Sequence, residues 1–185
     1  MMFTIKNGIH VVAIDDSPHH KGDTSTEVFF VYCKSTFLEY VTRTTITVDG
    51  IDATQKILEE LQKNQDNFNL ILLHGISVGG LNIVDIRTIS QTLQKPLLAI
   101  TENPPTAGAI YSAIQKVDNS DLREILVDQA GPMLPFSTTH GFKPIYISCQ
   151  NIDEKLVERF LKKFCIRSRL PEQLLLAHKI ASAWK

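Results

Sequence analysis

The order of the expected strands and helices constrains the fold of this chain more than any other feature of its sequence. Three early segments are rich in β-branched and aromatic residues, and they cover residues 8–16, 27–35 and 38–48. Only Thr36 and Phe37 separate the second segment from the third, which favours a tight antiparallel hairpin. Two more apolar strands, at 68–74 and 95–101, each follow a segment with apolar residues at helical spacing. Such β-α-β units add parallel strands to a sheet.

Helices and one further strand pair complete the expected elements. The longer helices are expected at 52–65, 82–94, 153–165 and 170–185. Segments 132–139 and 143–150 are expected to pair around His140 and Gly141. This order matches an α/β fold with an RNase H-like mixed sheet, antiparallel over strands 1–3, extended by parallel strands and flanked by helices, although other α/β folds share it. A length of 185 residues suits a single domain over 1–185.

The charge of the chain is balanced overall but uneven along its length. The net charge is −1, so the whole molecule is not an obvious binder of polyanions. Residues 1–150 carry eleven Lys and Arg against sixteen Asp and Glu, whereas residues 151–185 carry eight against four. A basic end beside an acidic body is compatible with a phosphate-binding rim around a metal centre, and also with a solvated amphipathic helix.

The cysteines and the N-terminal segment indicate the cellular compartment in which the protein is expected. Cys33, Cys149 and Cys165 lie far apart and lack the spacing of a zinc site. The first residues do not have the pattern of a signal peptide, and their apolar run is too short to span a bilayer. We therefore expect a cytoplasmic protein that does not enter a membrane.

Polar residues stand at the carboxyl ends of several expected strands, where open α/β sheets bind their ligands. Asp15 and Asp16 end the first strand, Asp49 and Asp52 follow the third, and His74 ends the fourth. Carboxylates that meet at one sheet edge repel one another, and a divalent cation relieves that repulsion. Mg²⁺ or Mn²⁺ held there can orient water and stabilise the oxyanions of a phosphodiester displacement.

Each of these residues also has a purely structural interpretation. Asp52 suits the N-cap of the helix that follows it, and Asp49 with the glycine after it is a common turn dipeptide. One of Asp15 and Asp16 can simply face solvent. His74, after an apolar strand, can be a hydrogen-bonded buried histidine.

The stretch GISVGGLN, residues 75–82, connects a strand to a helix. Its glycines, beginning with Gly75, let a backbone approach a ligand closely, and a helix expected to begin at Asn82 offers free N–H groups to a phosphate. Asp85 lies three residues after Asn82, in the spacing of a capping box. The stretch matches no nucleotide-binding motif, so a closely packed turn is the preferred interpretation.

The C-terminal region carries the basic residues. Lys162 and Lys163 end one amphipathic helix, and Arg167 and Arg169 precede the last one. We expect these four side chains to contact a nucleic-acid backbone. His178, taken alone, is an ordinary helix histidine.

Four segments resemble an archaeal family of uncharacterised proteins labelled endonuclease dU. They are AIDDSP, VDGIDAT, LLHGISVGGLNIVDI and LPEQLLLAHKIA, in that order along the chain. Members of that family look like relatives of endonuclease V, a metal-dependent nuclease for deaminated bases. The resemblance implies an RNase H-like, endonuclease V-like fold. It also implies nucleic acid as the partner, with DNA favoured over RNA, and Mg²⁺ or Mn²⁺ as the cofactor.

The resemblance also implies roles for single residues. Asp15 matches the first-strand aspartate of endonuclease V, and His178 matches the histidine position of its C-terminal helix. Asp49 or Asp52 occupies the region from which a second acid of the endonuclease V pattern could come. His74 stands where the family usually reads aspartate before glycine, and the LPEQLLLAH stretch lacks an expected proline and arginine. Imidazole suits Mn²⁺ or Zn²⁺ better than Mg²⁺, so His74 indicates either a changed metal preference or a loss of catalysis.

Three hypotheses follow for function. The first is a metal-dependent endonuclease, a hydrolase for the repair of deaminated or damaged DNA. In it Asp15, Asp16, Asp49 and His74 bind metal, and His178 positions water or a phosphate. The second is a catalytically inactive module on the same fold that binds nucleic acid or another partner. The third is a phosphohydrolase or nucleotide-binding protein for small molecules.

Overall fold

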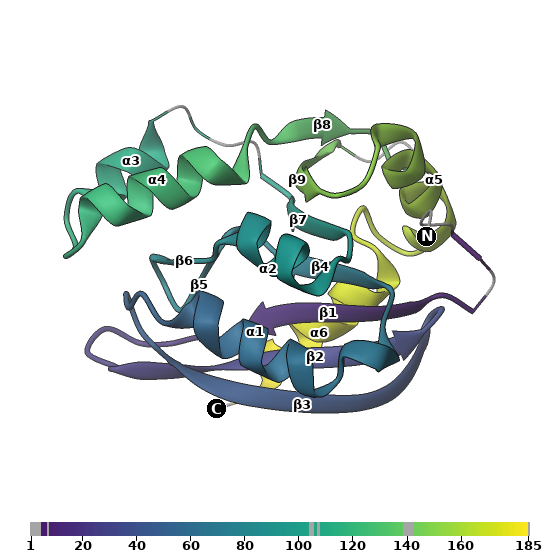
Figure 1. Cartoon of the computed structure of the whole chain (residues 1–185), viewed down its shortest axis with the longest axis horizontal. Helices are drawn as coiled ribbons and strands as arrows, with labels where there is room; N and C mark the ends of the chain where they lie inside the picture. The colour runs from purple at the N-terminus through teal and green to yellow at the C-terminus, as the bar shows by residue number, and fades with distance from the viewer. Residues whose placement is uncertain (1–4, 7, 104–105, 107, 139–142, 185) are drawn as a thin grey trace.

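A seven-stranded mixed sheet forms the centre of the protein (Figure 1). The computed structural model describes residues 5–6, 8–103, 106, 108–138 and 143–184. The strands lie in the order β3-β2-β1-β4-β7-β9-β8. Their bounds are β1 His10–Asp16, β2 Ser25–Lys34, β3 Phe37–Thr47, β4 Leu70–His74, β7 Leu97–Thr101, β8 Leu134–Phe136 and β9 Ile145–Gln150. A separate two-stranded ribbon pairs β5 Ser77–Val78 with β6 Asn82–Ile83.

The strand pairing confirms the expected mixed sheet. β1, β2 and β3 pair antiparallel, and β4 and β7 extend the sheet from β1 in parallel. β9 then pairs antiparallel with both β7 and β8, which confirms the second strand pair. His140 and Gly141 lie outside the described residues. The parallel strands β1, β4 and β7 therefore end at one edge of the sheet, and this edge carries the candidate site.

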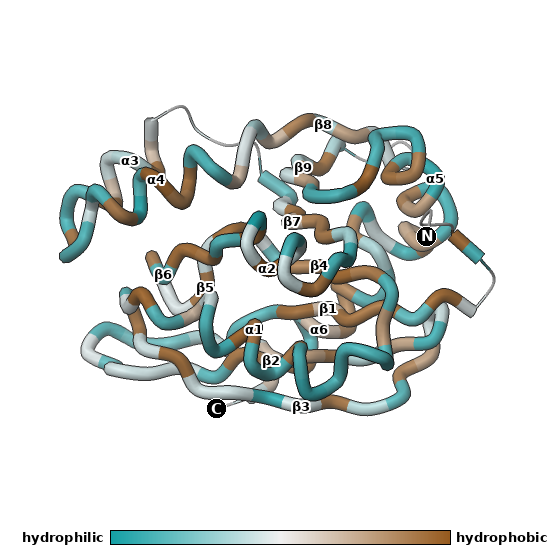
Figure 2. The backbone as a smooth tube through the Cα atoms, in the orientation of Figure 1, coloured by the Kyte–Doolittle hydropathy of each residue, from teal (hydrophilic) through white to brown (hydrophobic). Residues whose placement is uncertain are grey.

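Helices cover both faces of the sheet (Figure 1). Their bounds are α1 Ala53–Lys63, α2 Ile86–Leu93, α3 Ala109–Ile114, α4 Ser120–Ala130, α5 Glu154–Phe164 and α6 Glu172–Ala183, with a short 3-10 turn η1 at Gln65–Asn67. Successive strand residues point to opposite faces, so Val12 and Ile14 pack with α1 and α2, whereas Val11 and Ala13 pack with α5 and α6. Figure 2 shows the resulting hydrophobic run along β1 and β4. Among the described helices, none is long and apolar enough to cross a membrane.

The helix expected from Asn82 begins four residues later. Asn82 lies in β6, and α2 starts at Ile86 with Asp85 as its N-cap. The Asp85 carboxylate accepts the Thr88 N–H at 2.8 Å, which caps the helix. Asn82 is fully buried, and its side chain accepts the Ala53 N–H at 3.1 Å and donates to the Thr47 carbonyl at 2.9 Å. These contacts hold Asn82 in the ribbon rather than in the helix.

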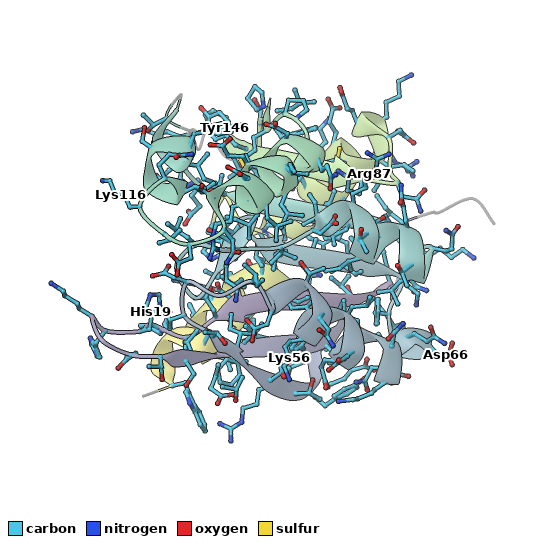
Figure 3. All side chains as sticks on the ribbon, turned by 60° about the vertical axis from the view of Figure 1, so that its left-hand side comes forward. His19, Lys56, Asp66, Arg87, Lys116 and Tyr146 are labelled. Atoms are coloured by element: carbon cyan, nitrogen blue, oxygen red, sulfur yellow. The ribbon has the colours of Figure 1, made fainter. Side chains whose placement is uncertain are left out.

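One buried arginine attaches α4 to the site edge. Arg123 is 1% exposed, and its guanidinium donates to the carbonyl oxygens of Gly50 at 2.8 Å, of Asp49 at 2.5 Å and of Leu81. Figure 3 shows the connection between α3 and α4, at Lys116, at the same end of the molecule as His19, with Asp66 at the opposite end. The α3–α4 pair is thereby fixed next to the carboxyl ends of the parallel strands.

Candidate metal centre

Asp15 lies at the carboxyl end of β1 and is 4% exposed. Its side chain shares the sheet face of Val11 and Ala13, which α6 covers, because strand residues alternate in direction. Asp16 shares the opposite face with Val12 and Ile14 for the same reason. Only one of the two adjacent carboxylates can thus contribute to a site on a given face.

Two histidines from distant parts of the chain meet Asp15. His74 ends β4, the parallel neighbour of β1, and His178 lies on α6. The Oδ2 atom of Asp15 lies 3.1 Å from Nδ1 of His74 and 2.8 Å from Nδ1 of His178. The two imidazole rings meet edge to face, with centroids 5.1 Å apart. Among the described residues, this is the one group of three or more His, Cys, Asp or Glu side chains whose ligand atoms converge.

The spacing and the donor set both fit a divalent transition-metal ion. One ligand atom from each of the three side chains lies within 4.8 Å of the other two, which is close enough for the three atoms to share one ion. Two imidazoles and one carboxylate suit Mn²⁺, Fe²⁺ or Zn²⁺ better than Mg²⁺, which prefers oxygen. Asp15, His74 and His178 are therefore able to hold such an ion.

The charges around His74 come from several acids. Burial disfavours its imidazolium form, but the hydrogen bond to Asp15 and the charges of Asp15, Glu102 and Asp16 outweigh burial and raise the pKa of His74. Arg169 holds Glu102 in place, with Nε 2.8 Å from Oε1 and Nη1 2.7 Å from the carbonyl oxygen. Glu102 is not among the residues expected from the sequence, although it directly follows β7, the parallel neighbour of β4. The rule that selected Asp15 and His74 would have selected it.

Asp16 does not join this cluster. Its carboxylate accepts the Gly79 N–H at 2.9 Å. Burial raises the pKa of Asp16, and the negative charge of the nearby Asp15 raises it further. Together they outweigh the hydrogen bond from Gly79, which lowers it. The Asp16 carboxylate thus anchors the loop after β5, and its expected role as a metal ligand stays a prediction that this placement does not favour.

Asp49 and Asp52, also expected near the metal, have structural partners instead. Asp49 accepts the Leu81 N–H at 2.8 Å and takes a left-handed φ of 51°, as its turn dipeptide predicts. Asp52 occupies the N-cap position of α1 but makes no capping hydrogen bond. Its carboxylate accepts from Asn82 Nδ2 at 2.7 Å and from Thr47 Oγ1 at 3.0 Å. Through these hydrogen bonds both carboxylates hold the turn after β3 in place.

The glycine loop after β4 is a packed turn. Its Gly79 and Leu81 N–H groups already donate to Asp16 and Asp49, so they are not free to cradle a phosphate. Gly80 has a φ of +82°, and a Cβ there would lie 2.4 Å from the Asp49 carboxylate. Gly75, with a φ of +81°, turns the chain directly after His74.

The four basic residues are divided between the two ends of the sheet. Arg169 reaches Glu102 beside the centre, and the exposed Arg167 side chain pairs with Glu172 at 2.5 Å. Lys163 contacts the carbonyl of Lys6, ahead of the amino end of β1, 3.4 Å away. Lys162 neighbours it on α5, which Figure 1 places at the end opposite the site edge. Backbone contacts by these residues stay a prediction, and the placement of the two lysines does not favour it.

Solved structures share this architecture. The endonuclease V of Ciona intestinalis, in complex with DNA that contains an inosine followed by a ribo-adenosine, has a TM-score of 0.61 at 14% identity, over 94% of this chain and 84% of that chain. The fold is thus that of an endonuclease V-like protein. Residues 7–185 match the family described as endonuclease dU, and the chain belongs to that family.

Relatives of similar length support this membership. A UPF0215 protein of Methanosarcina mazei is 31% identical over 182 residues, which cover 97% of this chain and 92% of the relative. A protein of unknown function from Archaeoglobus fulgidus has a crystal structure with a TM-score of 0.83 at 26% identity, over 95% of this chain and 97% of that chain. The expected family and fold are confirmed.

Proposed function

We propose that the protein is a metal-dependent endonuclease that hydrolyses phosphodiester bonds in deaminated or damaged DNA. The observation that carries the proposal is the convergence of Asp15, His74 and His178 at the ends of parallel strands. The endonuclease V-like fold adds support, because one structure with that fold holds inosine-containing DNA. An activity of this kind serves DNA repair.

The three side chains have distinct parts in this proposal. Asp15, His74 and His178 would hold the ion, with a preference for Mn²⁺ or another transition metal over Mg²⁺. When bound, a divalent ion supplies positive charge that activates water and stabilises phosphate oxygens. One oxygen atom of Asp15 contacts Nδ1 of both imidazoles, and an ion bound by these atoms would replace the two hydrogen bonds. The His178 side chain is 48% exposed, against 5% for Asp15, so a phosphodiester approaches the centre from the His178 side.

A cleavage assay tests the proposal. End-labelled duplexes with one deaminated base are incubated with Mn²⁺ or Mg²⁺ and with the parent, Asp15→Ala or Asp66→Ala. We expect Mn²⁺-dependent cleavage that falls by about 100-fold or more in Asp15→Ala. Asp66→Ala removes a carboxylate at the opposite end of the molecule and should cleave like the parent (Figure 3). Equal cleavage by parent and Asp15→Ala would contradict the proposal.

A non-catalytic module that binds nucleic acid is the second candidate. The observation in its favour is that two of the three clustered side chains, those of His74 and His178, are imidazoles, which bring no negative charge to hold a cation. This candidate predicts salt-sensitive binding of DNA with no cleavage in Mn²⁺, Mg²⁺, Zn²⁺ or Co²⁺. Cleavage that depends on Asp15 excludes it.

A further inference from the structure

A tryptophan at the end of α6 has an exposed but fixed ring. Trp184 is the C-cap residue of α6, the single tryptophan of the chain, and is 44% exposed. The ring of Phe29 packs against it at a centroid distance of 5.6 Å and a tilt of 59°. The guanidinium carbon of Arg43 lies 4.1 Å from the centroid of the Trp184 ring. Two partners therefore hold the orientation of a ring that still faces solvent.

The register of the sheet connects this group to the candidate metal centre. Asp15 on β1 pairs with Phe29 on β2, and Phe29 pairs with Arg43 on β3. Cross-strand partners share a face, and this row lies on the face that α6 covers, opposite α1 (Figure 1). Because strands lie about 4.8 Å apart, the Cα atoms of Asp15 and Arg43 are about 10 Å apart. His178 and Trp184 approach the two ends of the row from one helix.

The chemistry of this group suits an unpaired nucleotide. An exposed indole ring offers a surface on which any base can stack. A guanidinium stacks on aromatic rings and also donates to phosphate oxygens. The Arg43 side chain is 47% exposed, and its ion pair with Glu27 is long, at 4.0 Å. The other Glu27 oxygen accepts the Thr45 hydroxyl at 2.9 Å. Arg43 thus keeps donors for a phosphate while it supports the ring.

We propose that Trp184 and Arg43, supported by Phe29, form a platform for an unpaired nucleotide of the strand whose phosphate lies at the metal centre. The base stacks on the Trp184 ring, and Arg43 takes a phosphate beside that base. This inference rests on the proposed function, because it requires both groups to belong to one nucleic-acid strand. A separation of about 10 Å equals roughly three steps of about 3.4 Å between stacked bases. The platform therefore binds the strand at a short distance from the bond that is cut.

The single tryptophan makes the platform measurable without any variant. A single-stranded DNA oligonucleotide with one deaminated base is titrated into the parent, and Trp184 emission is recorded. One series contains EDTA, so that no strand is cut, and a second contains Mn²⁺. A base that stacks on an indole ring quenches its fluorescence, so we expect saturable quenching in at least one series.

Variants at the ring test its contribution to affinity. We expect Trp184→Leu to lower the affinity for the labelled oligonucleotide, measured by fluorescence anisotropy, by about tenfold, because leucine covers Phe29 but offers no ring for stacking. Mn²⁺ affinity should stay within about twofold of the parent. Phe37→Leu is the matched control, since it removes a 75% exposed ring at the other end of β3 and should bind like the parent.

A variant of the arginine keeps the test open if Trp184→Leu does not fold. Arg43→Gln removes one phosphate contact, so the slope of log affinity against log salt concentration should become shallower by about 0.7. Arg87→Gln removes an exposed arginine of α2, on the opposite face of the sheet, and should leave the slope unchanged.

The possible results separate the platform from the nuclease. The inference is overturned if the oligonucleotide quenches Trp184 in neither series, if Trp184→Leu and Phe37→Leu bind alike, or if Arg43→Gln keeps the slope of the parent. Quenching without cleavage in any metal would retain the platform and reject the nuclease. Cleavage that depends on Asp15, without quenching, would retain the nuclease and reject the platform.

Discussion

Two acidic stretches of this protein look alike in sequence and differ in use. IDDS ends β1 and VDGID follows β3, and both place carboxylates beside the same edge of the sheet. In the first, Asp15 meets the imidazoles of His74 and His178. In the second, Asp49 and Asp52 accept hydrogen bonds from backbone N–H groups and from neutral side chains.

The difference shows how to separate a structural acid from a site acid. Fixed N–H and amide donors occupy the oxygens of Asp52 and, although burial opposes it, lower its pKa, so the carboxylate is committed to the turn. The partners of Asp15 are two imidazoles, which can release their protons and bind a metal instead. Partner chemistry, rather than the number of acids in a stretch, therefore identifies the candidate centre.

The largest loss of stability is expected from a change of Arg123, which supports the VDGID stretch after β3. Arg123→Met keeps much of the side-chain volume but leaves the carbonyl oxygens of Asp49, Gly50 and Leu81 without their donor. We expect the free energy of unfolding to fall by about 3 kcal/mol. Urea denaturation measures this change, and Mn²⁺ affinity at pH 7 should stay within about twofold of the parent. A loss below about 1 kcal/mol would show that this buried arginine is not a main support of the turn.

Removal of the Asp15 carboxylate should lower metal affinity, whereas the matched change in the VDGID stretch should not. Asp15→Asn keeps the shape of the side chain and removes its charge. We expect Mn²⁺ affinity to fall about 100-fold, or about 2.8 kcal/mol, in calorimetric titration. Asp49→Asn is the matched change in the other stretch and should leave Mn²⁺ affinity unchanged. Equal losses in both variants would break the distinction between the stretches.

The fold and part of the site were predictable from sequence for identifiable reasons. Strand propensity and the two-residue gap near Thr36 predicted the hairpin, and β-α-β order predicted the parallel strands. The rule that ligands gather at strand ends selected Asp15 and His74. His178, 163 positions from Asp15, came only from the family resemblance, because helical periodicity does not say where α6 docks.

What the sequence does not show about the site also has physical reasons. Both faces of β1 are covered, so its apolar run shows no alternation that would tell Asp15 from Asp16. The partners of Asp52 include Asn82, 30 residues away, and no local pattern shows that pairing. The two prolines that follow Asn103 in the sequence indicate a turn, which gives Glu102 no signal as a site residue.

The metal preference of the centre can be changed at His74. His74→Asp replaces the imidazole with a carboxylate and so adds negative charge and oxygen ligands to the centre. We expect the ratio of Mn²⁺ to Mg²⁺ affinity to fall by on the order of tenfold, chiefly because Mg²⁺ binds more tightly. Competitive titration of the two ions gives the ratio. His10→Asp changes a histidine at the other end of β1 and controls for added charge; a similar shift there would assign the effect to net charge instead of ligation.

The smallest expected effect concerns Asp52 and has a defined dependence on pH. Asp52→Asn removes the carboxylate that accepts from Thr47 and Asn82, and we expect it to lower the free energy of unfolding by about 1 kcal/mol at pH 7. The folded-state pKa of Asp52 lies below its ordinary value near 3.8, so the folded protein binds that proton less readily than the unfolded chain. The contribution of Asp52 is therefore fully present above the unfolded-state pKa and is lost as pH falls through the folded-state pKa. Urea denaturation at pH 7, 5 and 3 should show a gap between parent and variant that is constant at the first two values and narrower at the third. A gap that stays constant to pH 3 would mean that the charge of Asp52 contributes nothing to the turn, and the contrast with Asp15 would then rest on position alone.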